Sequence, residues 1–250
     1  KPTMDAEEIR KEQNVILEEI HMVEDEPDDL VHDLLAEAAY GKHSLAYPIL
    51  GSAANIMSMT SDHLNQYKSE HYASDRIVIS AAGKLDDHLV ESIRKYFGTF
   101  DLVNGKSFQL NKPTFNQGTV YKSKQTEQNH LCLASPGVSY DDERIYALAL
   151  LNNIIGGNMS SRLFQEIREN RGLAYSVYSY HSAHEDSGLF TIYIGTAPQL
   201  TAEVLKVTYD VLEELTNQGI TDTELHKGKE QLKGSLLLGL ESTNSMMNRI

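Results

Sequence analysis

The chain has little cysteine and no long apolar segment, and each shortage excludes a class of protein. Cys132 is the only cysteine among 250 residues, so no disulfide forms within the chain. It lies in the strand-like pattern "NHLCLAS", which predicts a buried, unreactive thiol. No run of about 18 apolar residues occurs, which predicts no membrane span, and the start "KPTMDAEEIR" lacks the apolar core of a signal peptide. A signal removed before Lys1 stays an alternative, but a single cysteine is typical of a reducing compartment, so we expect a cytoplasmic protein.

Positive charge is also scarce. The sequence has 22 lysines and arginines against 36 acidic residues, and its formal net charge at pH 7 is −14. Nucleic acid is therefore not expected as a partner, because it binds basic surfaces. The acidity has two interpretations, which composition alone does not separate: ordinary solubility, or an acidic surface that attracts cationic peptides.

Helical and strand patterns alternate along the chain, which predicts an α+β fold. Helices are expected at 5–24, 28–39, 61–72, 86–97, 141–155, 160–170, 199–217 and from 221 onward. Strands are expected at 76–80, 119–124 and 130–135, followed by two long strands within 173–195 that are joined at "EDSG". The segment 101–118 has no sustained period and is interpreted as a linker.

Two glutamates of the first predicted helix lie where apolar residues are expected. An apolar arc runs from Ile9 to Val23, and Glu12 and Glu19 lie one above the other inside it, whereas Glu18 points away. A buried carboxylate is costly unless it is paired, hydrogen-bonded or bound to a metal. The ordinary explanation is a pair of buried ion pairs or a misaligned wheel. The functional one is a metal ligand with a supporting carboxylate, or an acid/base pair.

The last predicted helix repeats the pattern of the first. When Glu8 is placed over Glu224, the capping and core positions coincide, but Glu12 meets Gly228 and Glu19 meets Ser235. The helix therefore does not need the two carboxylates in order to form. The repeat predicts two related domains, one with a site and one without it.

Two long segments resemble a known family. The segment "EEIRKEQNVILEEIHMVEDEPDDLVHDLLAEAAYGKHSLAYPILG" is similar to the region after the metal motif in the pitrilysin, insulin-degrading enzyme and mitochondrial processing peptidase family. The segments "GGNMSSRLFQEIRENRGLAYSVYSY" and "EDSGLFTIYIGT" resemble its second half, most closely in bacterial processing-peptidase-like members. The resemblance implies two homologous domains, each a mainly antiparallel sheet covered by helices. Residues 1–112 would form the back part of the metal-bearing domain, and residues 113–250 the front part of the metal-free domain.

The same resemblance implies a zinc-dependent metalloendopeptidase that hydrolyses extended peptides enclosed between two domains. The acidic balance of the chain leads us to expect basic peptides. Glu19 matches the family's zinc-binding glutamate, and Glu12 matches a second glutamate that supports the catalytic site. Arg168 and Tyr175 match residues that reach the substrate near the scissile bond, where both side chains can donate to a developing oxyanion. Without the family, Arg168 would be interpreted as a solvated helix residue and Tyr175 as a packed strand residue. Arg171 offers an alternative register for Arg168.

The family's inverted H-x-x-E-H motif does not occur in these 250 residues. Two histidine ligands of Zn²⁺ and the catalytic glutamate are therefore expected upstream of Lys1. The chain is expected to be a fragment that is inactive alone, because one carboxylate is not a zinc site. The alternative is a catalytically inactive subunit of the same fold that binds peptides or scaffolds a complex. The implied partners are a peptide substrate and, by analogy, a second copy or a related subunit in a dimer.

Three further motifs receive ordinary interpretations. "GGNMSS" could cradle an anion, but it lacks the ending of a phosphate loop, so a helix cap is favoured. His181 and His184 are three residues apart on a strand and so face opposite sides, which argues against a shared metal. His21 and His32 are expected at the surface.

Overall fold

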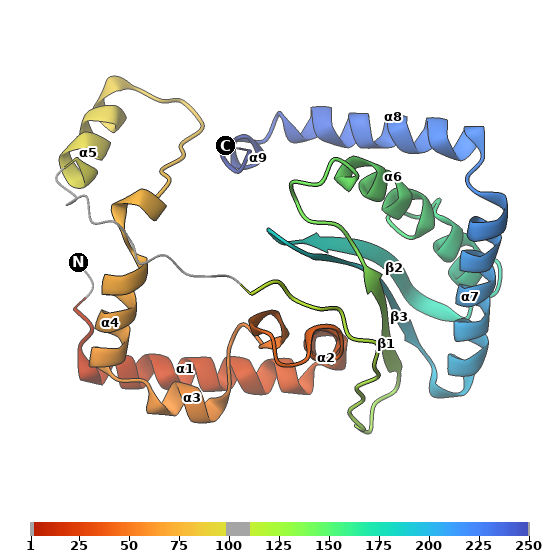
Figure 1. Ribbon diagram of the computed structural model, residues 1–250, viewed down its shortest axis with the longest axis horizontal. Helices are drawn as coiled ribbons and strands as arrows, with labels where there is room; N and C mark the ends of the chain where they lie inside the picture. The colour runs from red at the N-terminus through yellow and green to blue at the C-terminus, as the bar shows by residue number, and fades with distance from the viewer. Residues whose placement is uncertain (1–2, 99–110, 250) are drawn as a thin grey trace. The chain divides into compact units, whose positions relative to one another are not determined.

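The computed structural model describes residues 3–98 and 111–249, and its architecture is α+β (Figure 1). The predicted linker at 101–118 lies partly outside these residues. The α-helices are α1 (Ala6–Asp25), α2 (Pro27–Tyr40), α3 (Ala53–Ser58), α4 (Ser61–His71), α5 (Asp87–Phe97), α6 (Ile145–Ile155), α7 (Thr201–Gln218), α8 (Asp222–Gly239) and α9 (Thr243–Met247). The strands are β1 (Asn129–Pro136), β2 (Ala174–Ala183) and β3 (Gly188–Thr196). Shorter helical turns are η1 (Ser44–Ala46), η2 (Ser74–Arg76), η3 (Phe164–Glu169) and η4 (Pro198–Leu200).

The chain divides into two compact units. Unit 1 comprises Lys1–Glu18, Ser52–Leu110 and Lys233–Ile250, and unit 2 comprises Glu19–Gly51 and Asn111–Leu232. Two of the unit boundaries fall inside α1 and α8. The expected domain boundary at 112/113 stays a prediction. Among the residues described in both units, no helix combines the length and apolarity needed to cross a bilayer.

Unit 1 is helical in its described part. Asp5 caps α1 as predicted, because its Oδ1 accepts the backbone N–H groups of Glu7 at 2.9 Å and Glu8 at 3.3 Å. The buried residue of α1 is Gln13, whose amide donates to the carbonyls of Ile56 at 2.8 Å and Met59 at 3.0 Å. These bonds fix α1 against α3 and the turn that follows it.

The strand predicted at 76–80 does not form. The apolar run has an extended backbone at Ile77, but Val78 is 82% exposed and pairs with no other strand in the part of unit 1 that the structure describes. A strand needs a neighbour for its backbone N–H and C=O groups. The sequence pattern was typical of a buried strand, and the described residues of unit 1 contain no strand that could pair with it.

A three-stranded antiparallel sheet forms the centre of unit 2, in the order β1-β3-β2 (Figure 1). The hairpin predicted at "EDSG" is confirmed, since β2 and β3 pair from Ala183–Gly188 to Ala174–Thr196. One face of the sheet packs on α6, η3 and α7 around a buried apolar cluster. Its members are Ile155, Leu163, Ile167, Leu173, Ala174, Val177, Ile192, Ile194, Val204, Val207 and Val211.

Helix α2 contacts the sheet through aromatic and polar groups. His32 stacks on Tyr193 with ring centroids 5.5 Å apart, and its Nδ1 lies 2.8 Å from the Tyr180 hydroxyl and 3.6 Å from Cys132 Sγ. The prediction of a surface position for His32 is therefore wrong. Helix α2 begins at Pro27, after the break that ends α1, and turns this face onto the strands, which burial of the apolar residues around His32 favours.

The strand predicted at 119–124 is also absent. This segment instead lines a cavity of about 810 Å³ beside β1, together with residues of α2 and α7. Its end is held by Lys124, whose Nζ donates to the Glu24 carbonyl at 2.8 Å and to Asp25 Oδ1 at 2.9 Å. These contacts draw the segment toward the end of α1, and it does not pair with β1.

Candidate functional site

Arg168 and Tyr175 come together in unit 2, as the resemblance implies. The guanidinium carbon of Arg168 lies 4.7 Å from the centre of the Tyr175 ring and 4.9 Å from the centre of the Phe164 ring. All three side chains line a pocket of about 250 Å³. Tyr175 is 73% exposed, so its ring covers the guanidinium and still reaches solvent. The interpretation of Tyr175 as a packed strand residue is therefore wrong.

The local backbone explains why these side chains meet. Arg168 and Phe164 belong to η3, which is a π-helical turn, and Tyr175 is the second residue of β2. Beyond the end of the turn at Glu169, the Leu173 N–H donates to the Ile167 carbonyl at 2.8 Å, and buried Ile167 and Leu173 anchor the segment in the core. Single π-helical turns are frequent at functional sites, because they displace side chains from regular helical positions.

Arg171 does not share this environment. Its Nε lies 3.5 Å from Glu166 Oε2, and its side chain is half exposed. Among the residues that the structure describes, the carboxylate paired with Arg168 is that of the neighbouring Glu169, at 3.9 Å from Nε. The guanidinium that faces the pocket thus belongs to Arg168, and no closer carboxylate of the described residues binds its N–H donors.

The "GGNMSS" segment forms another wall of the same pocket. The Gly156 carbonyl accepts the Ser179 N–H at 3.0 Å, and a Cβ at Gly156 would stand only 2.6 Å from that nitrogen. Asn158 caps the following turn, since its Oδ1 accepts the Ser160 N–H at 2.7 Å. Gly156 therefore allows the backbone of this segment to approach β2 closely. The cap predicted for "GGNMSS" corresponds to Asn158 and not to the glycines.

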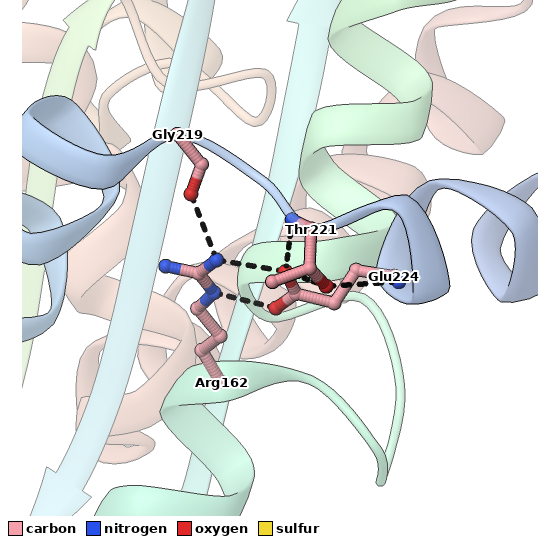
Figure 2. A network of polar contacts seen from close by, with 4 residues as sticks. All are labelled: Arg162, Gly219, Thr221 and Glu224. Carbon is pink, nitrogen blue, oxygen red and sulfur yellow. Dashed lines mark hydrogen bonds and ion pairs between the residues drawn. The ribbon is translucent and has the colours of Figure 1, made fainter.

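An ion pair fastens the segment before η3 to the start of α8 (Figure 2). Arg162 Nε and Nη2 donate to the two carboxylate oxygens of Glu224 at 2.7 and 2.8 Å, and Nη2 also donates to the Gly219 carbonyl at 3.0 Å. Thr221 completes the network with its backbone N–H and its hydroxyl. The hydrogen bonds from Arg162 lower the pKa of Glu224 to about 2. Sequence reasoning missed this pair, although Thr221 and Glu224 have the spacing of a capping box.

Glu12 and Glu19 lie on α1 as predicted, but both carboxylates are exposed. The expectation that they interrupt a buried stripe is therefore wrong for the described residues, in which α1 buries Gln13 instead. The nearest lysine in sequence, Lys11, pairs with Glu7 and Glu8 at 3.5 and 2.7 Å rather than with Glu12. Lys11 therefore does not supply the ion pair that was considered for Glu12.

A complete zinc site does not exist among the described residues. No group of three or more histidine, cysteine or carboxylate side chains comes together in residues 3–98 and 111–249. A zinc site needs about three protein ligands, so Glu19 fits only as one donor of a larger set. Cys132 offers no alternative, because burial raises the pKa of its thiol to about 12 and keeps it protonated.

Comparison with known proteins assigns the chain to a class of peptidase folds. The profile described as "Peptidase M16 inactive domain" matches residues 58–232, and that of "Insulinase (Peptidase family M16)" matches residues 1–53. The chain therefore belongs to peptidase family M16, as its sequence resemblance implied.

Among its relatives is the protein named uncharacterized zinc protease YmxG of Bacillus subtilis, which is 51% identical over 247 residues, or 99% of this chain and 60% of that protein. An uncharacterized zinc protease of Streptomyces coelicolor is 41% identical over 98% of this chain and 55% of its own length. The chain thus spans little more than half of these relatives.

Solved structures agree with this fold. The peptidase M16 inactive domain from Pseudomonas fluorescens superposes with a TM-score of 0.90 at 28% identity and covers 100% of this chain and 60% of that one. A protease from Helicobacter pylori superposes with a TM-score of 0.86 at 20% identity, over 98% of this chain and 61% of that one. The second match supports the fold alone.

Proposed function

We propose that the longer protein containing this chain is a zinc metalloendopeptidase of the processing-peptidase type. The observation that carries the proposal is the meeting of Arg168 and Tyr175 in one pocket beside a glycine loop. The named zinc proteases among the relatives support the reaction class. Residues 1–112 and 113–250 would belong to two homologous domains, of which only the first bears metal.

In this proposal Arg168 and Tyr175 bind the peptide substrate. The Arg168 guanidinium and the Tyr175 hydroxyl donate to a substrate carbonyl and stabilise the charge that its oxygen acquires during hydrolysis. Tyr175 is exposed, and among the described residues the carboxylate paired with Arg168 lies 3.9 Å from its Nε, which leaves donors of both side chains available for such a contact.

Glu19 would supply one ligand for zinc, and Glu12 would support it from one heptad earlier on the same face of α1. The exposure of both carboxylates favours this assignment, since each can be reached by groups from another element. Zinc would supply Lewis acidity toward the substrate carbonyl, and its remaining ligands would come from outside these 250 residues. The acidic balance of the chain, −14, would favour basic peptides.

The proposal is tested by zinc content and turnover in the complete natural protein, purified without added metal. We expect about one zinc per polypeptide, as a catalytic site with one metal requires. Glu19→Gln should remove most of the zinc and the activity, and Glu12→Gln should lower activity about 10- to 100-fold, as loss of an outer carboxylate usually does. Glu18→Gln is the control, because Glu18 is also exposed on α1 but points to a different side.

Three results would contradict parts of this proposal. A wild-type protein that neither contains nor takes up zinc would be an inactive peptide-binding or scaffolding subunit. Unchanged zinc content in the Glu19→Gln variant would remove Glu19 from the ligand set. Equal cleavage of basic and neutral quenched peptides at low and high salt would contradict the charge preference. A cytoplasmic location and a dimer stay predictions.

A further inference from the structure

We infer that Phe164 is a positioning residue of the substrate pocket, which acts by holding the Arg168 guanidinium against Tyr175. This inference rests on the proposed function of Arg168 in peptide binding. It adds a residue that does not itself need to touch the substrate, and it explains how a long, flexible arginine side chain is fixed in one orientation.

The geometry places the guanidinium near two aromatic rings. Its carbon lies 4.9 Å from the centre of the Phe164 ring and 4.7 Å from the centre of the Tyr175 ring. Both distances are within the range of about 6 Å over which a cation is attracted to an aromatic face. The Arg168 side chain keeps 36% of its surface exposed, so the rings hold it without enclosing it.

Phe164 and Tyr175 do not contribute equally to this arrangement. Tyr175 is 73% exposed and comes from the sheet, whereas Phe164 is half-buried and comes from the same π-helical turn as Arg168. Tyr175 also has a hydroxyl that can bind substrate, so its loss would remove two functions together. Phe164 has only its ring, which makes it the cleaner test of positioning.

An arginine side chain loses considerable conformational entropy when it is fixed. If its neighbours have already fixed it, that cost is not paid on substrate binding, and the bound complex is more stable. Hydrogen bonds cannot substitute for the rings in this role, because they would occupy the N–H donors that the substrate needs. Two aromatic rings attract the guanidinium as a cation and do not occupy its N–H donors.

The test compares Phe164→Leu with Phe164→Tyr in the complete natural protein. Leucine keeps an apolar side chain without an aromatic face, whereas tyrosine keeps the face. We expect Phe164→Leu to lower kcat/KM for a quenched peptide roughly three- to tenfold, mainly through KM, and Phe164→Tyr to restore it. Phe190→Leu is the matched control, because Phe190 packs against the core of the same unit and does not line this pocket.

A double-mutant cycle separates positioning from folding. In an Arg168→Ala background, Phe164→Leu should cause no further loss of kcat/KM, because there is no guanidinium left to hold. If the loss is the same with and without Arg168, or if Phe164→Tyr is as impaired as Phe164→Leu, Phe164 has only a packing role. If Arg168→Ala itself leaves kcat/KM unchanged, the proposed function of Arg168 fails first. The two failures are therefore distinguishable.

Discussion

Helices α1 and α8 begin with the same arrangement of capping residues but continue differently. Asp5 and Thr221 are equivalent in the internal repeat, and each side chain accepts a backbone N–H in the first turn of its helix. About two turns after these caps, exposed Glu12 in α1 corresponds to Gly228 in α8, which is buried. A Cβ at Gly228 would stand 2.7 Å from Leu150 Cδ1, so α8 lies directly against α6. The same position of the repeat is therefore buried against a neighbouring helix in α8 and exposed in α1.

This difference shows how one helical pattern can serve two purposes. In α8 the equivalent face is used for close packing, which requires a residue without a side chain. In α1 the face carries two carboxylates, and no core residue of the described chain covers them. A face that carries charge and is not needed for packing is available for a ligand, which supports the proposed role of Glu19.

The largest loss of stability is expected when the glutamate of α1 replaces the equivalent glycine of α8. Gly228→Glu would place a side chain and a charge into the contact with Leu150, and we expect it to destabilise the protein by about 3 kcal/mol or more. The reverse change in α1, Glu12→Gly, should cost only about 1 kcal/mol, the usual cost of glycine inside a helix. Urea unfolding of both variants checks the difference. Equal losses would show that the two helix faces are not packed differently.

The start of α8 is held by an arginine from another element, whereas the ion pairs at the start of α1 lie within its own helix. Glu8 pairs with exposed Lys11, whereas Glu224 binds half-buried Arg162 through two oxygens. At pH 7, Glu224→Gln should cost on the order of 2 kcal/mol, after allowance for partial exposure. Glu8→Gln is the control and should cost much less. A similar loss for both variants would contradict the special role of the Arg162 pair.

Acid titration sharpens the same comparison. The pKa of Glu224 is lowered from its ordinary value of 4.5 to about 2 by its hydrogen bonds with Arg162. A lowered carboxyl pKa stabilises the folded state above pH 4.5, and this contribution is lost as the pH falls through about 2. The difference in unfolding free energy between wild type and Glu224→Gln should therefore shrink between these pH values. A difference that does not change with pH over this range would assign the loss to packing.

Removal of the α1 cap should have a smaller effect. Asp5→Ala leaves the N–H groups of Glu7 and Glu8 without their side-chain acceptor and should cost about 1 kcal/mol. Asp5→Ser retains an acceptor and serves as the control. Helical circular dichroism during thermal unfolding would detect the difference. If Asp5→Ala and Asp5→Ser behave alike, the cap does not stabilise α1.

The smallest effect is expected at the second aligned position. Ser235 is exposed on α8, so Ser235→Glu should change stability by less than about 0.5 kcal/mol. Urea unfolding of Ser235→Glu and Gly228→Glu compares the two positions, because both variants introduce a glutamate into α8. A large loss at Ser235 would show that this end of α8 is covered in the complete protein.

Much of the helical structure could be predicted from the sequence, because its signals are local. The cap at Asp5, the break before Pro27 and the turn between β2 and β3 each depend on residues within a few positions. The strands expected at 76–80 and 119–124 failed for the opposite reason. A strand is defined by its neighbour, and the pattern of "RIVIS" does not show whether a neighbour is present.

The candidate site shows the same division. The family motif indicated Arg168 and Tyr175, and the structure brings them together, but no periodicity indicated that the Phe164 ring would also lie against the guanidinium. The π-helical turn is not visible in a regular helical wheel, which assumes one fixed angle per residue. The exposure of Glu12 and Glu19 was predicted wrongly because a wheel shows which residues share a face, not whether that face is covered.

The position of Cys132 has a practical consequence for experiments on this protein. Its thiol lies beside His32, and burial raises its pKa to about 12, so very little reactive thiolate exists at neutral pH. A cysteine introduced at an exposed position such as Ser235 would react with a maleimide probe much faster than Cys132 does. Fluorescent or spin labels can therefore be attached at one chosen position while the native cysteine stays in place.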